Sequence, residues 1–202
     1  MEQLSFFGDA GQSKGLPTDL LDYSAAVFTT EESHALLQIF MDTIAWEQRT
    51  ITMYGKCMPT PRLTAWYGDA GKNYAYSGSK FNPFPWTPKL LEVKKRIEPI
   101  AGVTFNSVLL NYYRNGNDSV AWHSDNETEL GLHPIIASVS FGQVRSFDIR
   151  HKQNHAEKYS IRLENGSLLL MQGNLQQHWE HRIAKSAVAM QPRINLTFRI
   201  IT

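Results

Sequence analysis

The stretch VAWHSDNETELG, residues 120–131, places a histidine and an aspartate two positions apart, directly after an apolar run. Side chains of a β-strand alternate between its two faces, so the strand that we expect here puts His123 and Asp125 on one face. A neutral imidazole and a carboxylate held side by side can bind one divalent metal ion. The pair alone equally fits a core histidine beside a surface carboxylate, so a metal site needs a further ligand from a distant strand.

Two more histidines, His178 and His181, lie close together in QHWEHRIA. On a strand they would face opposite sides, so only one of them can join the first pair. Two histidines and one carboxylate that leave three positions open form the metal triad of non-haem Fe(II) oxygenases. The pattern therefore indicates such a triad and leaves the choice between the two histidines open.

The last predicted strand, PRINLTFRIIT, has one polar and one apolar face. The polar face carries Arg193, Asn195, Thr197 and Arg199. If this face points into a barrel, its guanidinium groups require anionic partners. A small dicarboxylate would satisfy them through paired hydrogen bonds. The alternative is an amphipathic strand whose arginines face water, which is common in antiparallel sheets. Asn111 and Tyr113 form a similar polar pair on an otherwise apolar strand.

The elements that must position these residues are strands. From residue 104 onward about eight short strands alternate with polar turns, which is typical of a jelly roll or a related barrel. Two helices precede them: Thr29 and Glu32 form a capping box before the first, and Thr87-Pro88 begins the second. We predict an α+β, mainly β fold with one domain over residues 21–202, whose N-terminal helices buttress the outside of the sheet.

Composition is ordinary for a globular protein, with 42% hydrophobic and 19% charged residues in a chain of 202. No window approaches the run of about 18 apolar residues that a membrane span needs. The beginning of the chain, MEQLSFFGDA, lacks the basic region of a secretory signal. A single cysteine, Cys57, excludes internal disulfides and suits a reducing compartment. We expect a cytoplasmic monomer, associated with the nucleoid if the source is bacterial.

Charge is unevenly distributed along the chain. Residues 1–48 hold one basic and eight acidic residues, whereas residues 49–96 hold nine basic and two acidic ones. A basic segment beside an acidic one can mark a surface that faces nucleic acid when the total charge is near neutral. A solvated helix is the alternative, since Lys89 to Arg96 fall on the second predicted helix. Charge alone leaves both interpretations open.

Taken together, HSD, WEH and RINLTFR resemble the AlkB family of Fe(II)- and 2-oxoglutarate-dependent nucleic-acid dealkylases. The resemblance covers roughly residues 50–202, and YGDAG, PIIASVSFG and NLTFR resemble the branch that acts on duplex DNA. It implies a double-stranded β-helix core at about residues 104–202, with Fe(II), 2-oxoglutarate and dioxygen as the reacting partners. The metal ligands that it implies are His123, Asp125 and His181. The residues that it implies hold 2-oxoglutarate are Asn111, Tyr113, Arg193, Asn195, Thr197 and Arg199.

The resemblance also implies a nucleotide-recognition lid at about residues 49–86. Tyr74 and Tyr76, on either side of Ala75, match aromatics that stack on a flipped base, and a cationic methylated base would gain cation–π attraction. Ordinary aromatic packing is the alternative for these tyrosines. Met53 and Tyr54 in ITMYGK match an apolar finger that wedges into the duplex, and the adjacent Gly55 and Lys56 are expected to contact the substrate. Asn126 and Glu127 match positions that reach the base edge.

One segment departs from the duplex-acting branch, which can carry a basic run after the second histidine. Here that segment reads RIAKSAVAMQP, with only Arg182 and Lys185. We expect Arg145, Arg150 and Lys152 to compensate for the missing contacts to the second DNA strand.

The implied function is a DNA repair dioxygenase. It would demethylate 1-methyladenine and 3-methylcytosine in duplex and single-stranded DNA, and release formaldehyde, succinate and carbon dioxide. The alternatives are a related hydroxylase or demethylase acting on RNA or protein, and a barrel that binds without turnover. Residues 1–20 are expected to form a mobile arm. Within it QLSFF, Gln3 to Phe7, resembles the peptide by which bacterial proteins dock on the replication sliding clamp. An arm that folds back on the barrel is the alternative.

Overall fold

The computed structural model describes residues 17–53, 56–72, 74–76 and 79–202, and within these ranges the side chains of 51–53, 56, 74–76 and 79–81 are not described. The predicted clamp-docking peptide Gln3–Phe7 lies outside the described residues, as do Tyr54 and Gly55 of the predicted substrate contacts.

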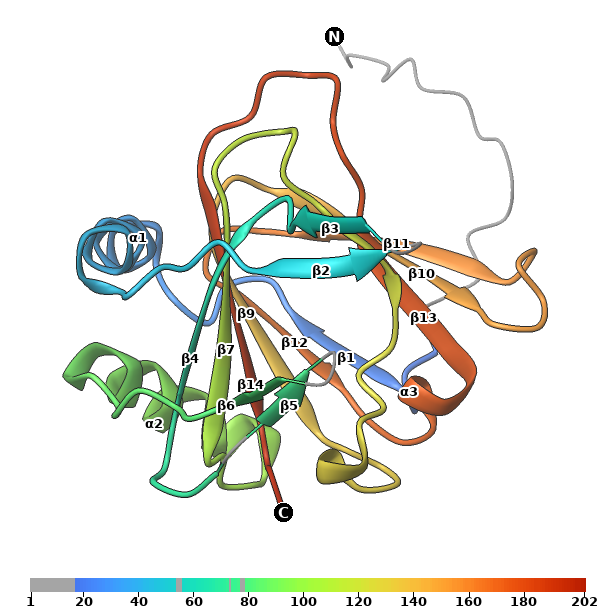
Figure 1. The fold of residues 1–202 in the computed structure, drawn as a ribbon, viewed down its shortest axis with the longest axis horizontal. Coiled ribbons are helices and arrows are strands. Elements are labelled where there is room, and N and C mark those ends of the chain that lie inside the picture. Colours follow the sequence, from blue (N-terminus) through green and yellow to red (C-terminus); the bar gives the residue numbers. More distant parts are fainter. Residues whose placement is uncertain (1–16, 54–55, 73, 77–78) are drawn as a thin grey trace, which may run out of the picture.

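Two antiparallel sheets face each other and form the predicted jelly roll (Figure 1). The six-stranded major sheet has the order β1 (Leu21–Ser24), β12 (Ser167–Met171), β9 (Ile136–Gly142), β14 (Arg193–Arg199), β7 (Ser107–Tyr113) and β4 (Leu63–Gly68). The four-stranded minor sheet has the order β11 (Lys158–Leu163), β10 (Arg145–His151), β13 (Trp179–Ile183) and β8 (Val120–His123). The eight strands expected after residue 104 are β7 to β14, so the predicted fold class is confirmed.

The strand β14 lies in the middle of the major sheet, between β7 and β9. Its register places Arg193 opposite Tyr113 and Asn195 opposite Asn111 on β7. Because side chains alternate along a strand, this register puts all the predicted polar residues of both strands on one face, toward the minor sheet. The apolar residues of β14 then cover the opposite face.

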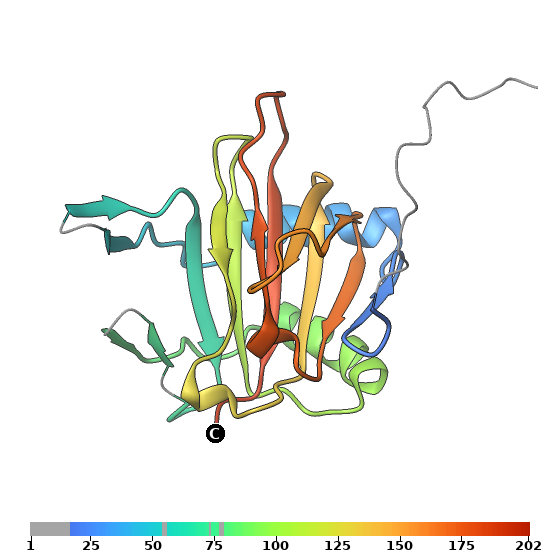
Figure 2. The same ribbon diagram turned by 90° about the vertical axis from the view of Figure 1, so that its right-hand side faces the viewer.

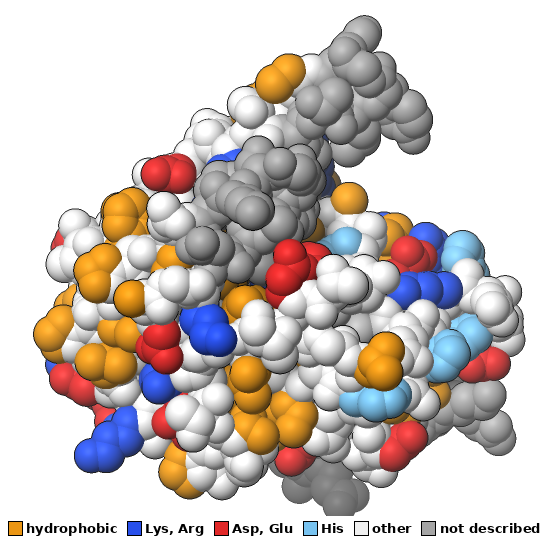
Figure 3. Space-filling model, turned by 60° about the horizontal axis from the view of Figure 1, so that its bottom comes forward, with side chains coloured by type: hydrophobic (Ala, Val, Ile, Leu, Met, Phe, Trp, Pro, Cys, Tyr) orange, Lys and Arg blue, Asp and Glu red, His pale blue; other side chains and the backbone are white. Residues whose placement is uncertain are grey.

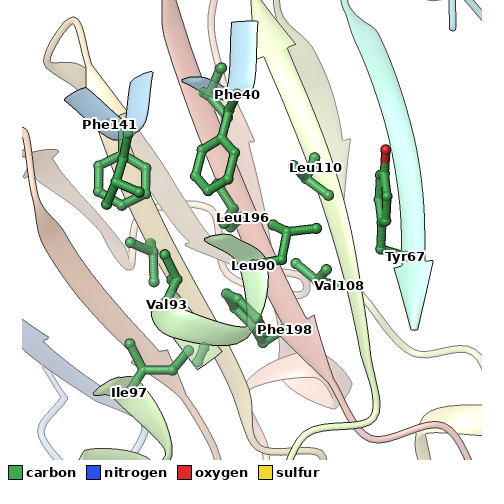
Figure 4. Close-up of a cluster of buried hydrophobic side chains, with 14 of the residues drawn as sticks. Phe40, Tyr67, Leu90, Val93, Ile97, Val108, Leu110, Phe141, Leu196 and Phe198 are labelled. Carbon is green, nitrogen blue, oxygen red and sulfur yellow. The ribbon is translucent and has the colours of Figure 1, made fainter. Parts of the chain in front are cut away.

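Two helices cover that opposite face, as predicted (Figure 2). Thr29 accepts a hydrogen bond from the Glu32 N–H and Glu32 accepts one from the Thr29 N–H, so the capping box that begins α1 (Thr30–Thr43) is present. Thr87 caps α2 (Pro88–Ala101), which begins with its proline at the first turn. Figure 4 shows Phe40 of α1 and Leu90 of α2 pointing at strand residues of the major sheet. This apolar layer fixes the outer side of the sheet.

A second apolar cluster fills part of the space between the two sheets. It includes Trp66 and Leu169 from the major sheet and Phe147, Ile149 and Leu163 from the minor sheet. The sheets are therefore held apart by packed side chains, and a cavity remains beside this cluster.

Residues 49–86, the predicted lid, contain three separate pieces. Two hairpins project from the body of the molecule (Figure 2): β2 (Thr50–Met53) with β3 (Lys56–Pro59), and β5 (Tyr74–Tyr76) with β6 (Ser79–Phe81). Between them the chain returns to the major sheet as β4, paired with β7. Residues 63–68 thus belong to the sheet and not to a loop. Ala65, Trp66 and Tyr67 are buried there.

Two boundaries near the predicted metal residues differ from the sequence analysis. The strand β8 ends at His123, so Asp125 lies beyond it, before the short 3-10 helix η1 (Thr128–Leu130). His178 ends a one-turn helix, α3 (Leu175–His178), and His181 lies on the following strand β13. The expectation that one strand carries both histidines is therefore wrong.

On the face shown in Figure 3, lysine and arginine side chains are interspersed with aspartate and glutamate. The charged blocks of the sequence therefore do not form a single basic patch on this face. Among the described residues, no helix has the length and apolar character needed to cross a membrane.

Candidate active site

The structure brings His123, Asp125 and His181 together. The two histidines are direct cross-strand partners on β8 and β13, and their ring centroids are 4.3 Å apart. Nε2 of His123 lies 3.9 Å from Oδ1 of Asp125. One ligand atom from each of the three residues lies within 4.8 Å of the others. Two imidazoles and one carboxylate at this separation fit a divalent transition metal such as Fe(II).

Burial and charge keep Asp125 and His181 in the protonation states that a metal requires. Burial acts to raise the pKa of Asp125, but Arg199 and the two histidines outweigh it and lower that pKa to about 2. Nη2 of Arg199 donates a hydrogen bond of 2.8 Å to Oδ1 of Asp125. Burial lowers the pKa of His181 to about 3. A carboxylate and a neutral imidazole are therefore ready to bind a cation at neutral pH.

The ring of His123 is oriented by its own strand. Its Nδ1 lies 2.9 Å from the carbonyl oxygen of Ala121, and a carbonyl can only accept a hydrogen bond. Nδ1 therefore carries the proton, and Nε2 is left with its lone pair on the side of Asp125.

A cavity of about 820 Å³ extends from the triad between the two sheets. The polar residues of β14 and β7 that the sequence analysis assigned to 2-oxoglutarate all line it, namely Asn111, Tyr113, Arg193, Asn195, Thr197 and Arg199. The triad and the predicted cosubstrate residues thus share one cavity.

Arg193 is the clearest sign that this cavity binds an anion. Its side chain is 1% exposed, and Nη2 donates to Oγ of Ser140 at 2.9 Å. Its guanidinium lies over the Tyr113 ring, with Cζ 5.1 Å from the ring centroid, and its Nε and Nη1 have no hydrogen-bond partner among the described residues. Burial lowers the pKa of Arg193 to about 10, so the group stays charged at neutral pH. A buried cation with unused donors is costly unless a ligand supplies an anionic oxygen, and a carboxylate of 2-oxoglutarate meets that need.

Asn195 and Thr197 line the cavity but use their polar atoms within the protein. The Asn195 amide donates to Oγ of Ser138 at 2.8 Å and to the carbonyl of Val139 at 3.0 Å. Its oxygen accepts a hydrogen bond of 3.0 Å from Thr197. These contacts tie β14 to β9, so we expect the two residues to position the arginines on either side of them.

Several polar residues in or next to the cavity were not found from the sequence, among them Arg62, Ser138 and Ser140. Arg62 precedes β4 and is buried, and its Nε donates to Oδ1 of Asn111 at 2.7 Å. No local pattern marks Arg62, because its partner lies 49 positions away. Ser138 and Ser140 both lie on the inner face of β9, and their two-residue spacing in IASVSFG was a signal that could have found them.

The basic residues expected to grip a second DNA strand are already engaged. Arg145 is buried and donates to three carbonyl oxygens, those of Asn115, Asp118 and Ala184. It therefore supports the barrel from within, and the prediction that it contacts DNA is wrong. Arg150 donates to Glu180 at 2.6 Å and Lys152 donates to the carbonyl of Gln176 at 2.8 Å.

The predicted substrate contacts receive less support from the structure. Asn126 is exposed and Glu127 half-buried, and neither is among the described residues that line the cavity. Met53 and Lys56 are paired at the end of the β2–β3 hairpin, and Tyr74, Ala75 and Tyr76 form β5, but their side chains are outside the description. The substrate roles of all these residues remain predictions.

Comparison with known proteins decides the family. Residues 21–199 match the family model of the 2OG-Fe(II) oxygenase superfamily. The chain belongs to that family. The His123, Asp125 and His181 set and the buried Arg193 beside it fit the Fe(II) and 2-oxoglutarate that the family name implies.

Curated relatives of the oxygenase include alpha-ketoglutarate-dependent dioxygenase alkB homolog 3 of Homo sapiens, 43% identical over 180 residues that cover 85% of this chain and 62% of the relative. DNA oxidative demethylase ALKBH2 of Bos taurus is 42% identical over 158 residues, which cover 75% of this chain and 57% of the relative. The chain thus spans about three fifths of the length of these relatives.

Among solved structures, that of OsALKBH1 superposes on the oxygenase with a TM-score of 0.59, covering 89% of this chain and 97% of that chain. The two sequences are 14% identical, so this likeness speaks for the fold alone.

Proposed function

We propose that the protein is an Fe(II)- and 2-oxoglutarate-dependent dioxygenase that removes methyl groups from alkylated bases in nucleic acid. DNA is the leading candidate for that nucleic acid. The observation that carries the proposal is the shared cavity, in which the His123, Asp125 and His181 ligand set lies beside a buried arginine with unused donors. The names of its relatives, which include a DNA oxidative demethylase, support the substrate class.

In this proposal, one group of cavity residues binds the metal ion and another binds the cosubstrate. The triad would hold Fe(II), and Arg193 with Arg199 would bind the carboxylates of 2-oxoglutarate. When bound, iron and 2-oxoglutarate use dioxygen to supply the oxidation of an N-methyl group. One oxygen atom enters succinate and the other leaves as part of formaldehyde, with carbon dioxide as the third product and the base restored. The apolar wall, which includes Leu109, Val120 and Met171, would keep bulk water from the reacting carbon.

The base would reach the triad through the open side of the cavity, which is lined by residues ahead of β2 and after β3. The exposed residues Glu47 and Gln48 lie there, next to the β2–β3 hairpin, and Thr60 lines the cavity beneath them. A base has to leave its stack to enter such a cavity. We propose that the two hairpins form the lid that receives it, with Tyr74 and Tyr76 stacking on the ring.

The test uses the purified protein with Fe(II), ascorbate and 2-oxoglutarate. Matched single-stranded and duplex oligonucleotides carry one 1-methyladenine or one 3-methylcytosine, and mass spectrometry follows the DNA. We expect a loss of 14 mass units per lesion, roughly the mass of one methylene, that requires 2-oxoglutarate and disappears in His123→Ala. The conversion on each oligonucleotide also ranks lesion and strand preference.

Other outcomes point elsewhere. Succinate formation without any change in DNA would keep the oxidation chemistry and move the substrate to RNA or protein. A folded, iron-loaded protein that yields neither succinate nor repaired base would contradict the proposal. Docking of Gln3–Phe7 on a sliding clamp, and a cytoplasmic location, remain predictions from the sequence.

A further inference from the structure

The three predicted metal ligands are not held equally by the backbone. His123 and His181 are partners in the β8–β13 ladder, so sheet hydrogen bonds fix them relative to each other. Asp125 lies two residues beyond the last pair of that ladder, in a segment without strand pairing. Something other than the sheet must fix its main chain.

A buried glutamine supplies that bond. Oε1 of Gln176 accepts a hydrogen bond of 2.9 Å from the backbone N–H of Asp125. The glutamine is 2% exposed and lies 51 positions away along the chain. Asp125 is therefore held twice, at its main chain by Gln176 and at its carboxylate by Arg199.

The orientation of this amide is determined by its neighbours. An N–H needs an acceptor, so the amide oxygen must face Asp125, and the NH₂ group must point away. It points at Sδ of Met171, 3.7 Å from Nε2, which is a weak acceptor on the cavity wall. A flipped amide would set two donors against each other, so one orientation is strongly favoured.

The position of Gln176 links the ligands to one another. It lies on α3, five residues before His181, and α3 runs directly into β13. Nζ of Lys152, just past the end of β10, donates to the Gln176 carbonyl at 2.8 Å and holds α3 against the minor sheet. One short segment, residues 175–183, thus carries one ligand and anchors the main chain of another.

We propose that Gln176 is a positioning residue for the metal centre, which sets the main chain of Asp125 at the distance that the two histidines require. The proposal rests on one part of the proposed function, namely that His123, Asp125 and His181 bind a metal ion. Partners of metal ligands typically contribute 10- to 100-fold to metal affinity. A glutamine that only stabilised the fold would leave affinity unchanged once the protein had folded.

The chain offers a matched control on the same helix. Gln177 is exposed, and its Nε2 donates to the carbonyl of Leu132 at 2.8 Å. This hydrogen bond joins α3 to the segment between β8 and β9, which also contains Asp125, but its acceptor is Leu132 and not Asp125. Gln177→Ala removes a tie of the segment, whereas Gln176→Leu removes the acceptor of the Asp125 N–H at nearly equal volume.

The experiment titrates Mn(II) into metal-free protein and counts the free ion by electron paramagnetic resonance, with thermal unfolding of each metal-free variant measured alongside. We expect Gln176→Leu to raise the Kd for Mn(II) about 10- to 100-fold. Gln176→Asn, which is one methylene too short to reach, should weaken binding as well and perturbs the core less. Gln177→Ala should keep the affinity of the parent protein.

The outcomes separate the inference from the function that it rests on. A parent protein that binds no Mn(II) would contradict the proposed metal site itself. A parent that binds while both Gln176 variants bind equally well would overturn the positioning role, even if they unfold at lower temperature. An equal loss of affinity in Gln177→Ala would also overturn it, because the whole segment and not the Asp125 contact would then be responsible. If Gln176→Leu does not fold, Gln176→Asn decides.

Discussion

At the scale of single residues, two buried charges in the site differ in how the fold supports them. Asp125 is kept charged by Arg199 and the two histidines, so its removal would deprive the buried Arg199 guanidinium of that carboxylate. Arg193 is fully buried, and two of its donor atoms have no partner among the described residues. Burying Arg193 is therefore unfavourable in the empty protein, and its removal should change stability and binding in opposite directions.

Arg193→Met tests this opposition. Methionine fills a similar volume without a charge, so we expect the metal-free protein to become more stable, by about 1–3 kcal/mol. The same change should weaken 2-oxoglutarate binding to the Mn(II)-loaded protein about 100-fold or more, because an ion pair and its paired hydrogen bonds are lost. Urea unfolding and isothermal calorimetry measure the two effects.

Arg162→Met is the control for that substitution, since Arg162 is exposed and forms a surface ion pair with Glu164. It should change neither quantity appreciably. If Arg193→Met binds 2-oxoglutarate like the parent, Arg193 does not contact the cosubstrate.

The residues of the site that could be predicted are those whose partners lie nearby in sequence or on one strand. The His123–Asp125 spacing and the polar face of β14 are of this kind. The choice of His181 over His178 could not be predicted from the pattern of residues. The two histidines lie on different elements, and α3, which ends at His178, has a single turn and so leaves no periodic signal. Arg62 and Gln176 act through residues about 50 positions away, so nothing in their own surroundings marked them.

At the scale of elements, strands with a polar and an apolar face and helices with caps were predictable, and β4 was not. Its residues are buried on both faces, and a strand without alternation resembles a loop rich in aromatics when glycine and proline flank it. The helix α1 shows the opposite case, since one capping box fixed its beginning. Its stability should depend on that cap and on the ion pair that joins it to α2.

The cap predicts a specific acid response. Hydrogen bonds from Arg96 and from the Thr29 N–H lower the pKa of Glu32 to about 2, below its ordinary 4.5. A carboxylate with a lowered pKa stabilises the fold fully above its unfolded pKa, and the contribution is lost as the pH falls from about 4.5 to about 2. Glu32→Gln should therefore lower the urea midpoint at pH 7, and the gap to the parent should narrow on acidification to pH 3.

Glu92→Gln makes the matching comparison, because Glu92 forms an exposed ion pair with Lys89 within α2 and caps no helix. It should lower the midpoint much less at pH 7. A gap for Glu32→Gln that stays constant from pH 7 to pH 3 would count against the role of the cap.

The turn before β12 docks α1 onto the major sheet and allows little change. Gly166 has φ +82°, and its carbonyl accepts hydrogen bonds from the N–H groups of Val27 and Phe28. A Cβ there would lie 2.5 Å from Oγ of Ser33 and equally close to the Phe28 carbonyl oxygen. Gly166→Ala should cost roughly 2–4 kcal/mol by urea unfolding, from backbone strain plus the clash.

Gly71→Ala separates the two contributions. Gly71 has a similar φ of +81°, but a Cβ there meets nothing within 4 Å. It should cost about 1 kcal/mol, the strain alone. Equal losses at both positions would mean that the turn adapts and does not dock α1.

At the scale of the whole molecule, the major sheet separates two environments. Its outer face packs on α1 and α2 in an apolar layer, and its inner face borders the cavity with its charged and polar residues. Helices, sheet and cavity thus form consecutive layers. The candidate metal ligands lie on the far side of the cavity, on the minor sheet and on the segment that follows β8. The predicted order of layers followed from the alternation within a few strands, whereas the exact course of residues 49–86 depended on contacts between distant segments.

The two-faced strand β14 has a consequence for how the gene tolerates change. If every position from 193 to 199 were substituted in turn, and both protein abundance and 2-oxoglutarate turnover were scored in cell extracts, the two scores should alternate with a period of two. Changes at Ile194, Leu196 and Phe198 should deplete the protein more than changes at the intervening positions, which line the cavity and should mainly remove activity. A single-codon deletion within the strand should abolish both at once, because it exchanges the two faces beyond that point.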